Sequence, residues 1–161
     1  MKTIKRRKKE NKTDYAKRIR LLKSEKPRIV FRKTNRYFIS QYVWSKEAKD
    51  KIEFGVNSKQ LLNFGWPKES SNSLKSIPAA YLLGLLIGKK ITDKKLESPI
   101  LDFGMQRVLH KTKIYGFLKG LKDSGIKIEC KEEMFPEEER IKGASLKNKI
   151  NFEKIKSKII K

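Results

Sequence analysis

Few residues in this chain have the types and spacing that catalysis or metal binding requires. The single histidine, His110, stands beside Lys111 and near Lys113, so a phosphate contact or an exposed loop fits it better than a general base. The single cysteine, Cys130, excludes an internal disulfide and a Cys-cluster zinc site, and we interpret it as a small apolar residue. Asp102 ends an apolar run without a second carboxylate nearby, which favours a role in capping a loop. These residues indicate that the chain is not an enzyme.

Two longer stretches resemble ligand sites but lack the required spacing. The run "GLLIGKK", which begins at Gly84, has one residue too few before its Gly-Lys pair for a phosphate-binding loop, and Lys90 stands where that loop has Ser or Thr. The glutamates of "EEMFPEEER" (132–140) lack the spacing and the turn glycine of a calcium-binding loop. A solvated face or a protein contact is the better interpretation of that run. We therefore expect no cofactor and no metal.

The chemistry that the sequence does supply is positive charge. The 161 residues include 41 Lys and Arg against 18 Asp and Glu, a net charge of +23. A compact fold with this charge repels itself, so we expect a polyanionic partner; nucleic acid is the commonest and an anionic membrane is the rival. The longest apolar run, 77–88, is shorter than the ~20 residues that span a bilayer. The N-terminus is charged from the start, so we expect no signal segment and a reducing, cytosolic compartment.

Three stretches with strand-like alternation follow one another through the most basic part of the chain. They span residues 28–33, 37–44 and 51–56. The short links predict an antiparallel meander, with a tight turn at Thr34-Asn35 in which Asn35 takes the left-handed conformation. We expect one face of the meander to be core, with Ile29, Phe31, Ile39, Val43 and Phe54 on it, and Ile52 and Val56 to share the side of Phe54.

A fourth strand and several helices complete the predicted fold. "SPILDFG" (98–104) predicts a buried strand that follows a helix, so it should run parallel to a neighbour. "IPAAYLLGLLIGKKITDKK" (77–95) predicts a buried helix in which Gly84 and Gly88 allow close approach to a strand or helix. "KIYGFLKGLKDSG" (113–125) predicts a second helix, with Gly125 at its C-cap. The fold class is thus α/β (α+β): a mixed sheet with helices packed on it and basic terminal extensions.

Shorter elements are predicted with less support from periodicity. We expect a short helix at 58–63, a strand at 126–130, an acidic turn at 135–143 and a basic amphipathic helix at 149–161. Trp66, in an irregular loop, is more often a core residue than a platform for stacked bases.

The basic N-terminal segment differs in composition from the middle of the chain. Residues 1–12 almost lack apolar side chains, so we expect them to be disordered until they bind a partner. Thr13 should cap the helix that follows, with Tyr15, Ile19 and Leu22 as its apolar stripe. The chain then divides into a basic N-terminal arm and helix (1–26), a globular α/β RNA-binding domain (27–130), and an acidic turn with a basic C-terminal tail (131–161).

Several motifs, in a fixed order over about residues 5–143, resemble those of one family. They are "RRKKENKTDYAKRIRLLKSEKPRIVFRKTNRYFISQ", "FGW", "PAAYLLGLLIGKK", "LDFGMQR", "LKGLKDSG" and "PEEERIKG". Together they are similar to the family of large ribosomal subunit protein eighteen, in its archaeal and eukaryotic form. The resemblance implies a non-catalytic protein of the cytoplasmic ribosome that binds 5S rRNA in the central protuberance. It further implies contacts with large-subunit rRNA and neighbouring ribosomal proteins, and none with a membrane.

The resemblance also makes RNA-contact candidates of residues in two segments. The N-terminal segment contributes Arg6, Arg7, Lys8, Lys9, Lys12, Tyr15 and Arg18. The hairpin contributes Arg28, Arg32, Lys33, Asn35, Arg36 and Tyr37, the last where archaeal relatives often have His. The planar fork of an arginine suits phosphate oxygens. Because Arg28 and Arg32 alternate with Ile29 and Phe31, we expect both arginines to face RNA and to be removable together without unfolding the domain.

Composition alone supports two other functions. A sequence-tolerant nucleic-acid-coating protein would carry the same charge, but it would not distinguish 5S rRNA from duplex DNA. A membrane-surface protein would use the basic amphipathic C-terminus, although that helix is short and lacks Trp. The buried helix predicted at 77–95 favours a folded binding surface over a coat.

Overall fold

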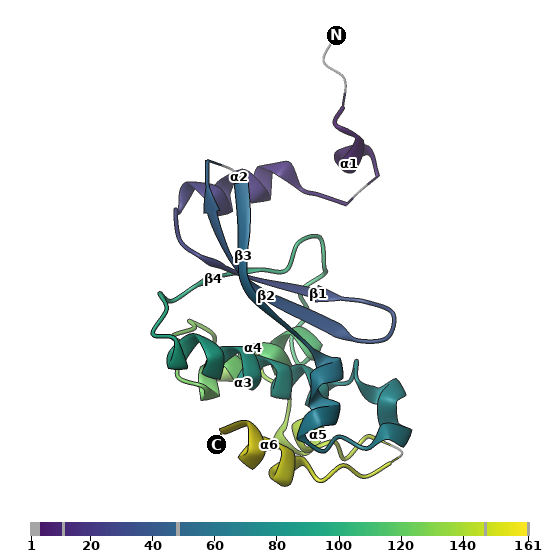
Figure 1. Ribbon diagram of the computed structural model, residues 1–161. Coiled ribbons are helices and arrows are strands. Elements are labelled where there is room, and N and C mark those ends of the chain that lie inside the picture. Colours follow the sequence, from purple (N-terminus) through teal and green to yellow (C-terminus); the bar gives the residue numbers. More distant parts are fainter. Residues whose placement is uncertain (1–3, 11, 48, 147, 161) are drawn as a thin grey trace.

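The computed structural model describes residues 4–10, 12–47, 49–146 and 148–160 (Figure 1). The strands are β1 (Arg28–Lys33), β2 (Phe38–Lys46), β3 (Lys49–Asn57) and β4 (Ile100–Asp102). The α-helices are α1 (Arg6–Lys9), α2 (Tyr15–Lys23), α3 (Ile77–Asp93), α4 (Lys113–Asp123), α5 (Glu138–Lys142) and α6 (Phe152–Ile160). Short 3-10 helices are η1 (Ser58–Phe64), η2 (Lys68–Ser73) and η3 (Glu132–Met134).

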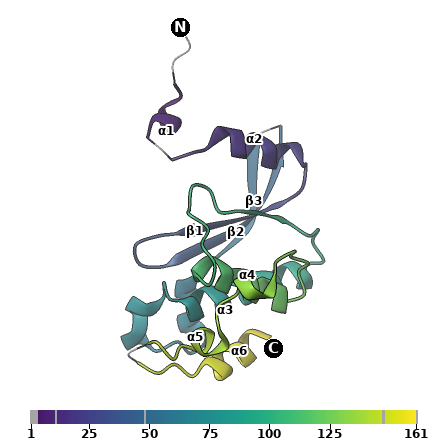
Figure 2. The same ribbon diagram turned by 180° about the vertical axis from the view of Figure 1, so that it is seen from behind.

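The four strands form one mixed sheet in the order β3-β2-β1-β4. β1 pairs antiparallel with β2 and parallel with β4, and β2 pairs antiparallel with β3. Helices α3 and α4 lie on one side of this sheet and α2 on the other, as both views show (Figures 1 and 2). The predicted α/β fold, its antiparallel meander and its added parallel strand are confirmed.

The hairpin between β1 and β2 differs from the prediction in its turn and in its register. Lys33 pairs with Phe38, so the turn has four residues, and the Thr34 hydroxyl donates to the Tyr37 carbonyl at 2.6 Å. Asn35 is not among the residues with positive φ, so the expected left-handed turn is wrong. The longer turn changes which residues of β2 face the core: Phe38, Ser40 and Tyr42 are buried there, while Ile39 lies half-buried on the opposite face.

A β-bulge in β3 corrects the predicted face of that strand. Tyr42 pairs with Phe54, but Val43 pairs with Ile52, which leaves Glu53 as the extra residue. The extra residue reverses the alternation, so Ile52 lies on the face opposite Phe54 and Val56 and is 53% exposed.

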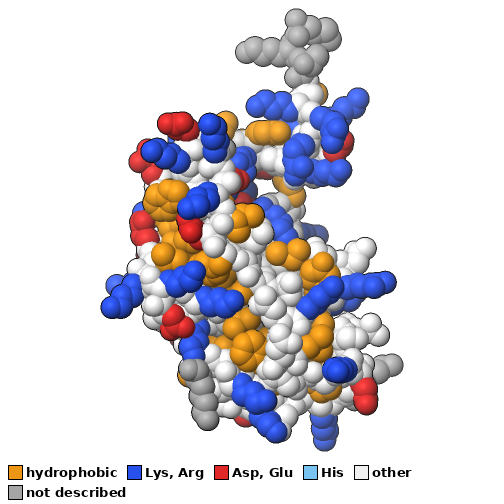
Figure 3. Space-filling view, in the orientation of Figure 1, with side chains coloured by type: hydrophobic (Ala, Val, Ile, Leu, Met, Phe, Trp, Pro, Cys, Tyr) orange, Lys and Arg blue, Asp and Glu red, His pale blue; other side chains and the backbone are white. Residues whose placement is uncertain are grey.

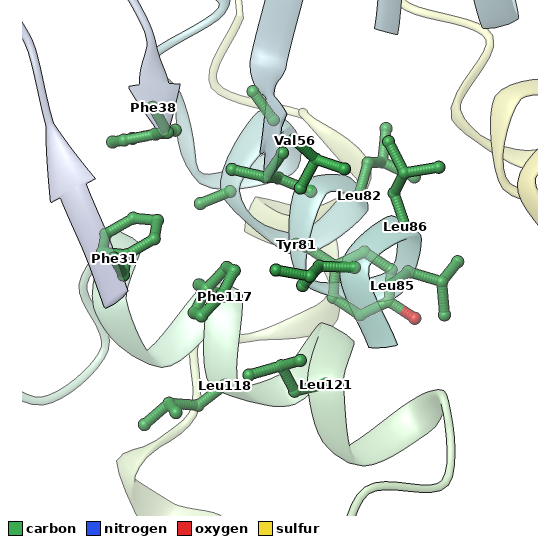
Figure 4. Packing of buried hydrophobic residues seen from close by; sticks show 14 of the residues in the cluster. Phe31, Phe38, Val56, Tyr81, Leu82, Leu85, Leu86, Phe117, Leu118 and Leu121 are labelled. Atoms are coloured by element: carbon green, nitrogen blue, oxygen red, sulfur yellow. The ribbon is translucent and has the colours of Figure 1, made fainter. Parts of the chain in front are cut away.

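The core lies between the sheet and two helices that run parallel to each other. Phe31 on β1 meets Phe117 on α4 with ring centroids 4.4 Å apart (Figure 4). α3 and α4 touch through glycines: a Cβ on Gly84 would stand 2.2 Å from the Phe117 carbonyl oxygen, and one on Gly120 would stand 2.1 Å from that of Tyr81. The prediction that Gly84 and Gly88 permit a close approach is confirmed, and the neighbour is a helix.

The C-terminal helices cover the side of α3 that faces away from the sheet (Figure 1). Phe152, Ile155 and Ile159 of α6 are buried in the same core cluster, so the predicted amphipathic stripe is used for packing. Trp66 is also buried, and its indole N–H donates to the Ser70 carbonyl at 3.1 Å, which confirms it as a core residue. The division of the chain at residues 26 and 130 stays a prediction.

Two weaker expectations for the C-terminal part were wrong. Residues 126–130 form no strand; Ile126 is buried in the core, and Ile128 and Cys130 pack against it half-buried. The acidic turn contains the short helix α5, which the left-handed Gly143 ends. Of the helices that the structure describes, none is long and apolar enough to span a bilayer.

Replacement of Gly84 by Ala should destabilise the fold by about 2 kcal/mol in urea unfolding. The added methyl overlaps the α4 backbone, which outweighs the ~1 kcal/mol that Ala gains in helix propensity. Gly55→Ala is the control, because a Cβ there comes nearest to the Gln41 side chain, at 3.3 Å, and meets backbone only at an ordinary 3.7 Å; it should change stability by less than about 1 kcal/mol. If the Gly84 variant were as stable as wild type, α3 and α4 could move apart to accept the added methyl, and the close contact would not be required.

Candidate nucleic-acid interface

The N-terminal segment contains one short helix that its composition did not predict. Arg6–Lys9 forms one helical turn, and the Arg7 Nε donates to the Thr13 hydroxyl at 3.0 Å. Thr13 therefore does not cap α2; Asp14 does, because its carboxylate accepts from the Lys17 backbone N–H at 3.0 Å. The prediction of Thr13 as N-cap is therefore wrong, while the expectation that residues 1–12 are disordered without a partner stays a prediction.

Helix α2 is attached to the sheet through polar contacts and not through the predicted apolar stripe. Ile19, the centre of that stripe, is 53% exposed, and α2 buries none of its residues completely. Instead the Lys17 ammonium donates to the Gly104 carbonyl at 3.2 Å, and Arg18 pairs with Asp50 at 2.9 Å.

Arg28 is the centre of a buried ion-pair network. Its side chain is 1% exposed and pairs with Asp50 at 2.8 Å and with Asp102 at 3.2 Å. It also donates to the Ser45 hydroxyl at 2.8 Å, while its Nε has no hydrogen-bond partner among the described residues. The expectation that Arg28 faces RNA is therefore wrong, and the buried network speaks against the expectation that it can be removed without unfolding the domain. Arg28 does point to the face of β1 opposite Ile29, as its alternation predicted. That face of the sheet is covered at this point, so Arg28 is not exposed.

Asp102 combines the loop-capping role that the sequence suggested with a second role. It accepts from the Gly104 backbone N–H at 2.8 Å, which closes the turn after β4. It also pairs with Arg32 at 3.2 Å, and its carbonyl accepts from Arg32 at 2.7 Å. Arg32 is half-exposed, so it is held from behind by Asp102 and remains open to a partner in front.

Asp50 is held in its charged form by the same network. Burial alone would raise the pKa of Asp50, but hydrogen bonds from Ser45 and Arg18, together with the charges of Arg28 and Arg18, outweigh burial and lower it. The carboxylate thus stays ionised over the whole physiological range.

The network forms one wall of a pocket that we call the N-terminal pocket, of about 320 Å³. It joins α1, α2 and the end of β4. Its cationic lining is Arg7, Lys12, Lys17, Arg18 and Arg32, against the carboxylates of Asp14 and Asp102; Tyr15 and the exposed Met105 complete it. Figure 3 shows Lys and Arg side chains over this end of the molecule, with acidic side chains beside them.

The remaining candidate residues lie outside this pocket. Arg6 pairs with Glu10 at 3.3 Å, as does Lys12 from the pocket lining at 2.8 Å, and Lys8 and Lys9 are exposed on α1. The hairpin residues form a separate group. Asn35, Arg36 and Tyr37 line a pocket with Lys59 and Lys75, while Lys33 lines the next pocket with Arg107 and Lys113.

Sequence reasoning did not connect Lys59, Lys75, Arg107 and Lys113 with the hairpin. Each is surrounded in the sequence by residues typical of an ordinary solvated helix or loop. Only the tertiary fold brings them to the hairpin tip, so a local pattern could not have found them.

The residues that were first considered for catalysis pack against neighbouring side chains or lie half-buried. The exposed ring of His110 packs edge-on against Tyr115, with centroids 5.4 Å apart. Cys130 is half-buried, and burial raises the pKa of its thiol. No group of His, Cys, Asp and Glu in the described part of the chain could hold a metal ion.

A basic α/β surface of this kind is typical of proteins that bind RNA, and the comparisons place the chain among the proteins of the large ribosomal subunit. Residues 1–98 match the family described as "Ribosomal large subunit proteins 60S L5, and 50S L18". The large ribosomal subunit protein uL18 of Korarchaeum cryptofilum is 41% identical over 138 residues, which are 86% of this chain and 69% of that protein. The chain therefore belongs to the uL18 family, and it is a structural constituent of the ribosome.

The Arg28→Met variant should lose about 3 kcal/mol of stability in urea unfolding at neutral pH. It leaves buried Asp102 and exposed Asp50 without their shared partner. Arg32→Met is the matched control, since it leaves the Arg28 pair intact and removes a half-exposed charge, and it should cost under about 1 kcal/mol. Equal, small losses in both variants would contradict a structural role for Arg28.

The Asp50→Asn variant should alter the acid stability of the protein. A carboxylate with a lowered folded-state pKa adds stability above its usual pKa of about 3.9, and that stability is lost as the pH falls through the lowered value. The variant should thus melt below wild type at pH 7, and the two melting temperatures should converge as the pH falls below the usual pKa of Asp and through the lowered value. A difference that persists unchanged at low pH would show that Asp50 acts through packing and not through its charge.

Proposed function

We propose that this chain binds 5S rRNA and anchors it in the central protuberance of the large subunit. The observation that carries the proposal is the N-terminal pocket, in which four cations from residues 7–18 and Arg32 from β1 line one opening. Its partners would be 5S rRNA first, then large-subunit rRNA and neighbouring ribosomal proteins. Family membership supports the ribosomal setting, and the charge of +23 supports an RNA partner.

The pocket suits the backbone of folded RNA better than the edges of paired bases. The major groove of A-form RNA is too narrow for side chains, so proteins recognise its shape, its phosphates and its unpaired bases. Arg18 and Arg32 are held by carboxylates behind them, so their guanidinium planes are oriented before binding. Oriented arginines lose less side-chain entropy when they meet a phosphate.

The proposed contacts differ from the expected set in one residue. Arg28 is removed from it, because its side chain is buried against Asp50 and Asp102 and acts on RNA only by positioning Arg18 and Arg32. The others remain proposed contacts: Arg6, Arg7, Lys8, Lys9, Lys12, Tyr15, Arg18, Arg32, Lys33, Asn35, Arg36 and Tyr37.

A salt series with 5S rRNA, and with an RNA duplex of matched length as competitor, tests the function. We expect selective binding that survives the competitor near 0.15 M salt, with affinity falling steeply as salt rises. The double variant Arg7→Gln, Lys12→Gln should weaken 5S binding about tenfold and lessen the salt dependence by about one phosphate for each charge. Equal binding of both RNAs by wild type would favour the sequence-tolerant coating protein instead.

A further inference from the structure

The tip of the β1–β2 hairpin lies beside the N-terminal ends of two helices. α3 and α4 are parallel, because Gly116 meets Ile77 near their starts and Gly88 meets Ser124 near their ends. The fold therefore brings Lys75, just before α3, and Lys113, the first residue of α4, to the same end of the molecule. Lys33, the last residue of β1, is near both: burial lowers the pKa of Lys113, and the charges of Lys33 and Lys75 lower it further.

These cations belong to a larger set that we call the tip surface. Its members are Lys33, Arg36, Tyr37, Lys59, Lys75, Arg107 and Lys113. Two pockets open on it, and neither has a carboxylate in its lining. Figure 3 shows Lys or Arg side chains extending from the side where the hairpin tip lies in Figure 1.

The tip surface differs from the N-terminal pocket in how its charge is compensated. In the N-terminal pocket Arg18 and Arg32 pair with Asp50 and Asp102. No cation of the tip surface takes part in a salt bridge within the part of the chain that the structure describes. Mutual repulsion among these cations opposes folding, and a polyanion bound there would relieve it.

Tyr37 adds an aromatic surface to this group of cations. Its ring is half-buried and lines a pocket with Asn35, Asn72 and Leu62. The ammonium of Lys59 lies over the ring, 4.6 Å from its centroid. Lys59 is exposed, so it can leave the ring without loss of packing and give a flat ligand access to the same face.

We propose that the tip surface binds an unpaired nucleotide of RNA, with the base stacked on Tyr37 and the adjoining phosphates on Lys33, Lys75 and Lys113. The proposal rests on the proposed function. It adds the class of nucleotide that is bound, and it adds Lys75 and Lys113, which the family motifs do not contain. The amide groups of Asn35 and Asn72 offer donors and acceptors to a base edge, which a duplex would hide. A lipid surface fits poorly as the partner. The nearby apolar side chains cannot insert into a bilayer, because Leu62 is half-buried and Leu74 is buried.

Stacking on Tyr37 can be measured with a short oligoribonucleotide that carries 2-aminopurine, used alone and in a duplex of the same sequence. The full-length wild type and Tyr37→Phe should quench the single strand and bind it about tenfold more tightly than Tyr37→Leu does. All three proteins should bind the duplex equally. Equal single-strand affinity and quenching by wild type and Tyr37→Leu, with native circular dichroism, would overturn the proposal.

The phosphate contacts need a control for net charge. The triple variant Lys33→Gln, Lys75→Gln, Lys113→Gln should lower the salt dependence of single-strand binding by about two logarithmic units per logarithm of salt. The control triple Lys127→Gln, Lys154→Gln, Lys158→Gln removes the same charge from exposed positions away from the tip and should leave most of that dependence in place. Equal effects of the two triples would mean that only net charge matters, and the site would be rejected.

Failure of this proposal can be told from failure of the proposed function. Selective binding of 5S rRNA that Tyr37→Leu leaves unchanged would reject the tip site alone. Single-strand binding that depends on Tyr37, without selectivity for 5S rRNA, would support the tip site and reject the 5S function.

Discussion

The buried guanidinium of Arg28 fixes three parts of the molecule in one arrangement. From β1 it reaches Asp50 at the start of β3 and Asp102 at the end of β4, and each carboxylate accepts a second arginine, Arg18 from α2 or Arg32 from β1. Removing a charge from water is unfavourable unless its partners are in place, so these elements are positioned together or not at all. Three arginines share two carboxylates, and the surplus positive charge faces the N-terminal pocket. The fold thus builds this surface with the same ion pairs that hold α2 on the sheet.

A second constraint determines what lies at the opposite end of β1. Parallel helices place like ends of their dipoles side by side, which is unfavourable unless close packing compensates for it. Gly84 and Gly120 permit that packing, since each glycine meets the backbone of the other helix. The consequence is that both helix N-termini, with Lys75 and Lys113, gather at the hairpin tip. Lys75 and Lys113, which are far apart in the chain, thus become neighbours because the backbones of α3 and α4 are in contact.

The elements with strong local patterns could be predicted from the sequence, and the interactions between distant segments could not. Strand 28–33, the helices that begin near residues 77 and 113, and the parallel fourth strand follow from alternation, periodicity and chain order. Ile39 was placed on the wrong face because the four-residue turn shifts the register, and Ile52 because of the bulge at Glu53. Arg28 has the same alternation as a surface arginine; what buries it are carboxylates 22 and 74 residues away along the chain.

The two basic surfaces suit different parts of an RNA molecule. An arginine held by a carboxylate has lost its side-chain freedom before binding, so it can recognise only a phosphate at a fixed position and orientation. The unshared lysines of the tip surface keep that freedom, and they can follow a strand whose nucleotides are not held in a helix. A fixed surface is complementary to folded RNA, and an adaptable surface with an aromatic ring is complementary to an unpaired nucleotide. The distribution of carboxylates around the sheet, more than the number of basic residues, therefore underlies the different RNA feature that we propose for each end of the protein.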